Sequence, residues 1–226
     1  MLTLTIGPSQ YDVARGTLTL PRVGMWHADL TVNADGPVTG AAVATLDGVD
    51  MPAHIQKAEM VEGMLELRLV GGNGGMGKPA KPNHYKGATV RHVFMDLVQG
   101  VGEVPSTAAS SAAVLDLPIK AWTSLAVPTG ELMQALADTA AEIMGSDVSW
   151  RALYDGTIWL GAESWPMCPA DVRILAADGA NSSQLLGTDA LGIWPGTTIS
   201  NRRIDSVVHQ IGGQNRSTVY WAEAHL

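Results

Sequence analysis

The chain has 226 residues, of which 46% are hydrophobic, so it is long and apolar enough for one large or two small domains with a packed core. No apolar run approaches the roughly 18 residues that a membrane-spanning helix needs. The N-terminus also lacks the basic start and long apolar stretch of a signal peptide, so we expect synthesis in the cytoplasm and no membrane insertion. The single cysteine, Cys168, excludes an internal disulfide and any multi-cysteine metal site.

The net charge of −8 disfavours specific nucleic-acid binding, because proteins of that class gather Lys and Arg on one surface. Only Lys78, Lys81 and Lys86 form a loose group in the sequence, besides the isolated pair Arg202-Arg203. The chain has seven tryptophans and one phenylalanine. Trp combines a large apolar surface with a polar group, so this usage favours a protein that packs against other proteins.

The first seventy residues show short alternating apolar runs separated by turn residues, a pattern typical of β-strands. Turn chemistry is clearest at residues 33–37 and at Asp47-Gly48. Six strands in so short a stretch predict a small barrel or sandwich. The six predicted strands are Leu2–Ile6, Gly16–Leu20, Trp26–Val32, Ala41–Leu46, Ala53–Val61 and Met64–Val70.

A glycine-rich stretch follows the sixth strand and nearly matches a phosphate-binding loop. Gly72 to Lys78 fit the first seven positions of the pattern G-x-x-x-x-G-K-[ST], but the next residue is Pro79. A nucleotide site needs a hydroxyl there to hold magnesium, together with a helix whose N-terminus faces the phosphates. We therefore expect a flexible loop that does not bind ATP.

Helical spacing begins at Val90, with Thr89 as the expected N-cap and Gly100 or Gly102 as the end. Residues 105–113 are small and polar, so we predict a linker over 105–128. A second helix is expected from Thr129 as its cap to the residue before Gly145. The predicted fold class is therefore mainly β with two helices, an α+β arrangement.

The remaining residues predict four strands. Asp155-Gly156 separates the runs 148–154 and 157–165 and is the strongest hairpin signal of the sequence. Two further strands are expected at 197–211 and 217–224, and the first should bend because fifteen residues exceed the usual strand length. We predict an N-terminal barrel-like domain over 1–104 and a C-terminal β-rich domain with one helix over 129–226.

Two enzymatic or binding readings remain open from the residues alone. Glu163 could act as the general acid of a small cell-wall glycan hydrolase, with Asp155 or Asp171 as its partner. Tryptophans in β-structure could stack on sugars, which would make the chain a carbohydrate-binding β-module, and the candidates are Trp159, Trp165 and Trp221. Asp155 is already explained by its turn, and hairpin tryptophans are more often cross-strand packing partners, so both activities stay alternatives to a structural role.

Several segments resemble phage tail hub proteins, the baseplate hub or late-control-type proteins that cap the tail tube. In the first half these are Leu67–Gly77 and then His84–Arg91, which opens a helix ending at Gly102-Glu103. In the second half, Ser149–Gly161 and Pro195–Ile199 leading to Arg203–His209 resemble the second, tube-like domain of that family. The similarity covers most of residues 60–226. Members are often longer, so a reduced hub or a distal tail component is also compatible.

The resemblance implies two tail-tube-like β-barrel or sandwich domains and a structural role without catalytic residues, cofactors or metal ligands. It further implies a homotrimeric ring in the virion tail, assembled in the host cytoplasm, in contact with tail tube, tape-measure and spike or other baseplate proteins. An acidic ring would repel the DNA that passes through it. We expect the glycine-rich loop to order on docking, and the candidate interface residues are Trp122, Trp194, Trp221, Lys78, Lys81 and Lys86.

Overall fold

The computed structural model describes residues 2–168, 174–177, 184–187, 193–199, 201–212 and 215–222. These residues form two compact units, which are not consecutive in the chain. The first unit contains Met1–Arg22, Trp26–Val70 and Ser164–Leu226, and the second contains Val23–Met25 and Gly71–Glu163.

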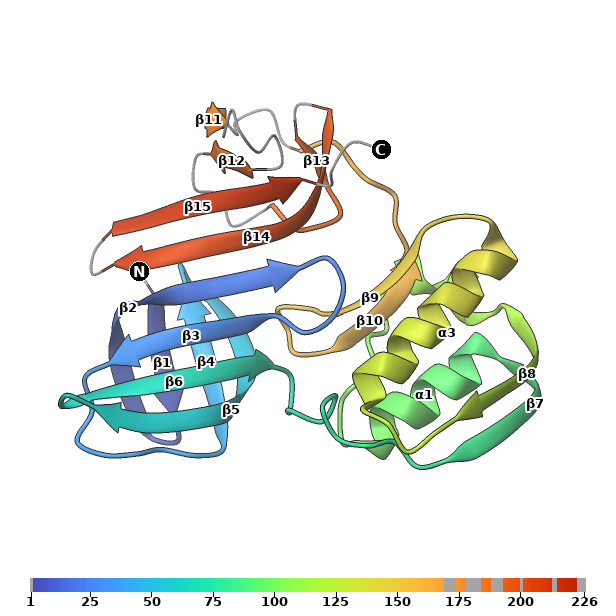
Figure 1. The fold of residues 1–226 in the computed structure, drawn as a ribbon, viewed down its shortest axis with the longest axis horizontal. Helices are drawn as coiled ribbons and strands as arrows, with labels where there is room; N and C mark the ends of the chain where they lie inside the picture. Colours follow the sequence, from blue (N-terminus) through green and yellow to red (C-terminus); the bar gives the residue numbers. More distant parts are fainter. Residues whose placement is uncertain are drawn as a thin grey trace. The chain divides into compact units, whose positions relative to one another are not determined.

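Six antiparallel strands of the first unit close into a barrel (Figure 1). Their order is β1-β4-β5-β6-β3-β2, and pairing of β1 with β2 closes the ring. Alternate side chains of each strand point inward, and Leu4, Leu46 and Leu65 have no exposed surface. The six predicted strands and the small barrel are confirmed. The strands are β1 (Leu2–Ile6), β2 (Ser9–Pro21), β3 (His27–Val32), β4 (Ala41–Leu46), β5 (Val49–Val61) and β6 (Met64–Gly71).

Strand β2 also extends the sheet beyond the barrel. One edge of β2 pairs with β1 over Ser9–Asp12 and then with β14 over Arg15–Pro21. The extension continues through β15, β12 and β11. The predicted long strand was expected to bend, but it is two strands, β13 and β14, which pair antiparallel with the left-handed residue Asn201 (φ 62°) between them. The strands are β11 (Ile174–Ala177), β12 (Gln184–Gly187), β13 (Thr198–Ile199), β14 (Arg202–Gly212) and β15 (Asn215–Ala222).

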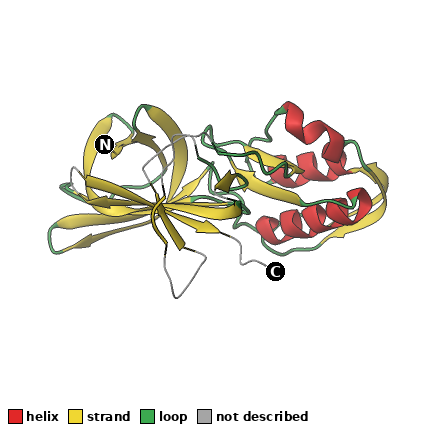
Figure 2. Cartoon of the chain, turned by 90° about the horizontal axis from the view of Figure 1, so that it is seen from above, coloured by secondary structure: helices red, strands yellow, loops and turns green. Residues whose placement is uncertain are grey.

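The second unit combines helices with two small sheets (Figure 2). Helix α1 begins after Thr89, whose hydroxyl accepts a hydrogen bond from the His92 N–H (3.3 Å), as predicted. The hairpin β9–β10 turns at Asp155-Gly156, also as predicted, and β7 pairs with β8. The elements are β7 (Asn83–Thr89), α1 (Val90–Gly100), the 3-10 helix η1 (Ala109–Ser111), α2 (Ala112–Leu115), β8 (Pro118–Ser124), α3 (Thr129–Met144), β9 (Val148–Ala152) and β10 (Ile158–Ala162).

The structure differs from the predicted helices and domains in three respects. Its described residues form three α-helices where two were expected, because the small residues around 112–115 form the short helix α2. The described residues show one barrel, and a second barrel- or sandwich-like domain is not confirmed, since the described part of the second unit holds two-stranded sheets packed with helices. The cap of α3 is Pro128, and the Thr129 hydroxyl instead donates to the Lys78 carbonyl (3.0 Å).

The two compact units also differ from the predicted division into residues 1–104, a linker over 105–128, and residues 129–226. The expected linker holds η1, α2 and strand β8, and β8 pairs with β7. Helix α3 and the β9–β10 hairpin belong to the same unit as the glycine-rich loop. Strands β7 and β8 pair although α1, η1 and α2 lie between them in the sequence. Local sequence patterns do not predict pairing between such distant segments.

A substitution at Gly16 tests how closely neighbouring strands pack in the barrel wall. A Cβ atom at this position would lie 2.3 Å from the Asp29 carbonyl oxygen of the neighbouring strand. We expect Gly16→Ala to lower the free energy of unfolding by about 1–3 kcal/mol, because two paired backbones must move apart. Urea denaturation measures this change. At Gly36 a Cβ would meet nothing within 4 Å, so Gly36→Ala should be nearly neutral, and equal effects at the two sites would contradict this packing.

Candidate functional site

A buried carboxylate organises the glycine-rich loop between β6 and β7. Glu103, which is only 3% exposed, follows α1, and its carboxylate accepts hydrogen bonds from the backbone N–H groups of Asn73 (2.9 Å) and Gly75 (2.6 Å). The Asn73 side chain donates to the Gly102 carbonyl (2.8 Å). Gly75 is required here, because a Cβ atom would lie 2.4 Å from the Val101 carbonyl oxygen. Charge-assisted hydrogen bonds of this kind are among the stronger ones in proteins.

The far side of the same loop is tied to the start of α3. The Lys78 carbonyl accepts from the backbone N–H (2.9 Å) and the hydroxyl (3.0 Å) of Thr129, and the Gly130 N–H donates to the Met76 carbonyl (2.9 Å). The expectation of a flexible loop that orders on docking is therefore wrong, because both sides of the loop are hydrogen-bonded within the unit. Two of its N–H groups already bind the protein's own carboxylate, which is consistent with the expected lack of nucleotide binding.

Removing the charge of Glu103 tests this arrangement. We expect Glu103→Gln to lower the free energy of unfolding by about 1–3 kcal/mol, because an amide cannot accept both hydrogen bonds and leaves a buried N–H without its acceptor. Hydrogen exchange should accelerate at the Asn73 and Gly75 amides. The matched change Glu131→Gln, at an exposed position of α3, should alter neither quantity. Unchanged exchange in the Glu103 variant would contradict the assignment.

Glu163, the candidate general acid, is held in a buried ion pair. Its carboxylate accepts hydrogen bonds from Arg151 (2.6 and 3.2 Å) and from the Ser149 hydroxyl, and its side chain is 3% exposed. The Arg151 guanidinium lies 4.4 Å from the centre of the Trp159 ring. Both oxygens of this buried carboxylate therefore already accept hydrogen bonds from the protein. Asp155 instead caps its own turn by accepting from the Thr157 N–H (2.9 Å), and Asp171 lies outside the described residues.

The tryptophans considered for sugar stacking are also engaged. Trp159 is 5% exposed and donates to the Ser110 hydroxyl (3.1 Å). The Trp165 ring lies near the guanidinium groups of Arg22 (5.4 Å) and Arg203 (4.6 Å). The side chain of Trp221 lies outside the described residues. These contacts give no support to a carbohydrate-binding or hydrolytic site.

The buried pair of Arg151 and Glu163 gives a second test. Arg151→Ala should lower the free energy of unfolding by about 3–5 kcal/mol, because it leaves a buried carboxylate without its cation. The double change Arg151→Met with Glu163→Met should cost less than that single change, since it removes both charges and keeps the volume filled. Thermal or urea denaturation distinguishes the two results. A double variant that is less stable than Arg151→Ala would contradict a charge-pairing role.

The structure brings most of the candidate interface residues together in the second unit. We call β7, β8 and residues 78–82 the lysine ribbon. Lys86 pairs with Ala121 in the register of β7 and β8, Trp122 pairs with Tyr85, and the Ser124 hydroxyl donates to the Lys81 carbonyl (2.9 Å). Lys78, Lys81 and Lys86 are exposed and Trp122 is half-buried. Lys120, which the sequence analysis missed, lies beside them in β8.

The other two candidates lie in the first unit. Trp194 is half-buried, and its carbonyl accepts from the Thr197 hydroxyl (2.8 Å). The backbone of Trp221 pairs with Gln184 and Ser206 inside the sheet extension. No interface role of any of the six residues is tested by the fold, so all of them remain predictions.

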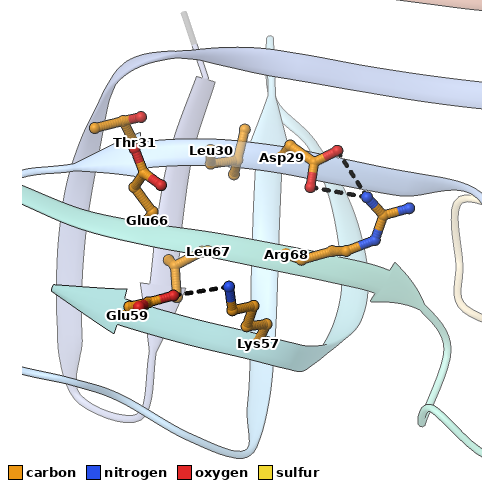
Figure 3. A pocket seen from close by; sticks show the side chains of 8 residues that line it. All are labelled: Asp29, Leu30, Thr31, Lys57, Glu59, Glu66, Leu67 and Arg68. Atoms are coloured by element: carbon orange, nitrogen blue, oxygen red, sulfur yellow. Dashed lines mark hydrogen bonds and ion pairs between the residues drawn. The ribbon is translucent and has the colours of Figure 1, made fainter. Parts of the chain in front are cut away.

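A charged hollow of about 380 Å³ lies on the outer wall of the barrel, across β3, β5 and β6 (Figure 3). The Arg68 guanidinium contacts both carboxylate oxygens of Asp29 at 3.0 Å, and the Lys57 ammonium lies 2.7 Å from the Glu59 carboxylate. Their hydrogen bond raises the pKa of Lys57 and lowers the pKa of Glu59. Glu66 lines the same hollow.

A second hollow, of about 290 Å³, lies between the lysine ribbon and α1. Its lining includes Lys81, Asp96 and Leu97 together with Tyr85, which packs against the rings of Trp122 (6.0 Å) and His92 (5.7 Å). Burial raises the pKa of the Tyr85 hydroxyl. The lysine ribbon therefore holds a buried tyrosine and a half-buried tryptophan together with exposed lysines.

Two classes of site are not found in the part of the chain that the structure describes. No group of three or more His, Cys, Asp or Glu side chains is placed to hold a metal ion there. Among the same residues, no helix has the length and apolar character needed to cross a membrane.

Solved structures of tail proteins share this architecture. The 43 kDa tail protein of prophage MuSo2 from Shewanella oneidensis aligns with a TM-score of 0.68 and 11% identity, over 98% of this chain and 97% of that chain. A tail protein from Neisseria meningitidis MC58 aligns with a TM-score of 0.64 and 12% identity, over 98% and 96%. The chain has the fold of phage tail proteins.

A related secretion component shares the tail protein fold. The E. coli c3393 protein, a component of the type VI secretion system described as similar to the bacteriophage T4 tail proteins gp27 and gp5, aligns with a TM-score of 0.63 and 11% identity, over 99% of this chain and 77% of that chain. No family model matches the sequence, and a comparison with curated proteins gives no match. At 11–12% identity the likeness establishes the fold and assigns no side chain a role.

Proposed function

We propose that the chain is a structural component of a bacteriophage tail, in the hub or distal baseplate ring that joins the tail tube to the tip. The observation that carries this proposal is the alignment of nearly the whole chain with nearly the whole of two tail proteins. The sequence segments 67–77, 84–91 and 149–161 support the same family independently of the structure. The role is architectural and needs no catalytic residue or cofactor.

In this proposal the chain acts as a homotrimer in the virion tail, after assembly in the host cytoplasm. Its partners are the tail tube, the tape-measure protein and the spike or other baseplate proteins. The lysine ribbon is the favoured contact surface, because Trp122 supplies an aromatic group beside exposed cations. The net charge of −8 suits a ring through which DNA passes without binding.

Self-association and co-purification with other tail proteins test the proposed function. We expect the full chain to have the mass of a trimer by light scattering coupled to size-exclusion chromatography. It should co-purify with the tail tube protein of the same phage when the two are expressed together. A capsid protein of that phage, expressed in the same way, serves as the control for unspecific association. A chain that binds neither itself nor any tail protein would contradict the proposal.

A further inference from the structure

The charges of this acidic chain are unevenly distributed. Residues 71–124 carry five Lys or Arg and three Asp or Glu, whereas the rest of the chain carries nine and nineteen. All three acidic side chains of the segment are engaged: Glu103 under the glycine-rich loop, Asp116 with Arg91 (2.7 Å), and Asp96 beside His92 (3.5 Å). Within the described residues, no ion pair neutralises the four exposed lysines of the lysine ribbon, Lys78, Lys81, Lys86 and Lys120. The lysine ribbon is therefore an unpaired cationic surface.

The first unit presents the complementary surface. We call residues 56–66, where β5 turns into β6, the hairpin tip. Glu59, Glu62 and Glu66 give it a net negative charge, and Met60 (39%) and Val61 (38%) are exposed large apolar side chains. Lys57 forms its ion pair with Glu59 and lies near Glu66 in the same hollow, so the three carboxylates outnumber the one cation of the hairpin tip.

The backbone of the hairpin tip is open along one edge. Strand β4 pairs with β5 only as far as His54, opposite Ala41. Beyond that point β6 is the one described strand beside β5, so residues 56–61 leave N–H and C=O groups unpaired along their other edge. An exposed edge of this kind, next to apolar side chains, is a common protein interaction site.

We propose that the hairpin tip of one copy docks on the lysine ribbon of a second copy. Val61, two residues from Glu59 and so on the same face of β5, packs against the exposed Ala121, which shares a face of the lysine ribbon with its cross-strand partner Lys86. Glu62 and Glu66 pair with Lys81 and Lys86 of the lysine ribbon. The two surfaces differ, so the contact is heterologous, and repeated contacts of this kind generate a ring when the rotation closes. The inference deepens the proposed homotrimer, on which it rests.

Charge reversal tests the contact in the full-length chain. The ribbon variant carries Lys81→Glu with Lys86→Glu, the tip variant carries Glu62→Lys with Glu66→Lys, and a third chain combines all four changes. Each single-surface variant should weaken self-association by about tenfold or more, because like charges then face each other across the interface. The combined variant should regain the wild-type association, since its charges are again complementary. Sedimentation at several concentrations measures the association, and circular dichroism confirms that each variant is folded.

A matched control distinguishes the effect of the local contact on association from the effect of the net charge. Asp35→Lys with Glu142→Lys changes the net charge as much as the tip variant does, at exposed positions outside both surfaces, and should leave association unchanged. A monomeric wild-type chain, or a combined variant as weak as the single-surface variants, would overturn the inference. If the ribbon variant kept its mass but lost the tail tube protein, the lysine ribbon would belong to that partner; the inference would then fail and the proposed tail function would stand.

Discussion

The backbone hydrogen bonding of one strand, β2, governs the first unit. Buried N–H and C=O groups need hydrogen-bond partners. One edge of a strand can therefore pair with two different strands only if the pairing changes from one to the other along its length. Strand β2 does so at an irregularity between Val13 and Arg15: before it the edge pairs with β1 and closes the barrel, and after it the edge pairs with β14 and extends the sheet. Gly16 lies directly after this change, where a side chain would strike the neighbouring strand.

Local patterns predicted the parts of the fold that depend on local contacts. Strands β1 and β4 were predicted with their observed bounds, because their buried and exposed side chains alternate. Helix α1 was found through its apolar stripe and the Thr89 cap. Strands β7 and β8 were missed, since Asn83–Thr89 and Pro118–Ser124 contain proline, glycine and lysine and do not alternate. Their pairing spans α1, and such long-range pairing leaves no periodic signal in either segment.

The contacts of the glycine-rich loop were likewise only partly predictable from the sequence. Pro79 was enough to argue against nucleotide binding from the sequence. The actual partner of the loop could not be inferred, because Glu103 lies about thirty residues away and an isolated glutamate after a helix is usually solvated. The loop resembles a phosphate-binding loop because its N–H groups do bind an anion, but the anion is a carboxylate of the same unit. That internal ligand fixes the loop and leaves its lysine at the surface.

The fold, the fixed loop and the uneven charges together motivate the proposal that the cationic and acidic surfaces of this protein contact neighbouring proteins. The central claim is that several copies form a ring in a phage tail. Electron cryomicroscopy of the intact particle tests it most directly. The account predicts three copies of the barrel arranged around the tail axis where the tube meets the tip. A map in which the chain is absent from the particle, or occupies the capsid, would contradict it.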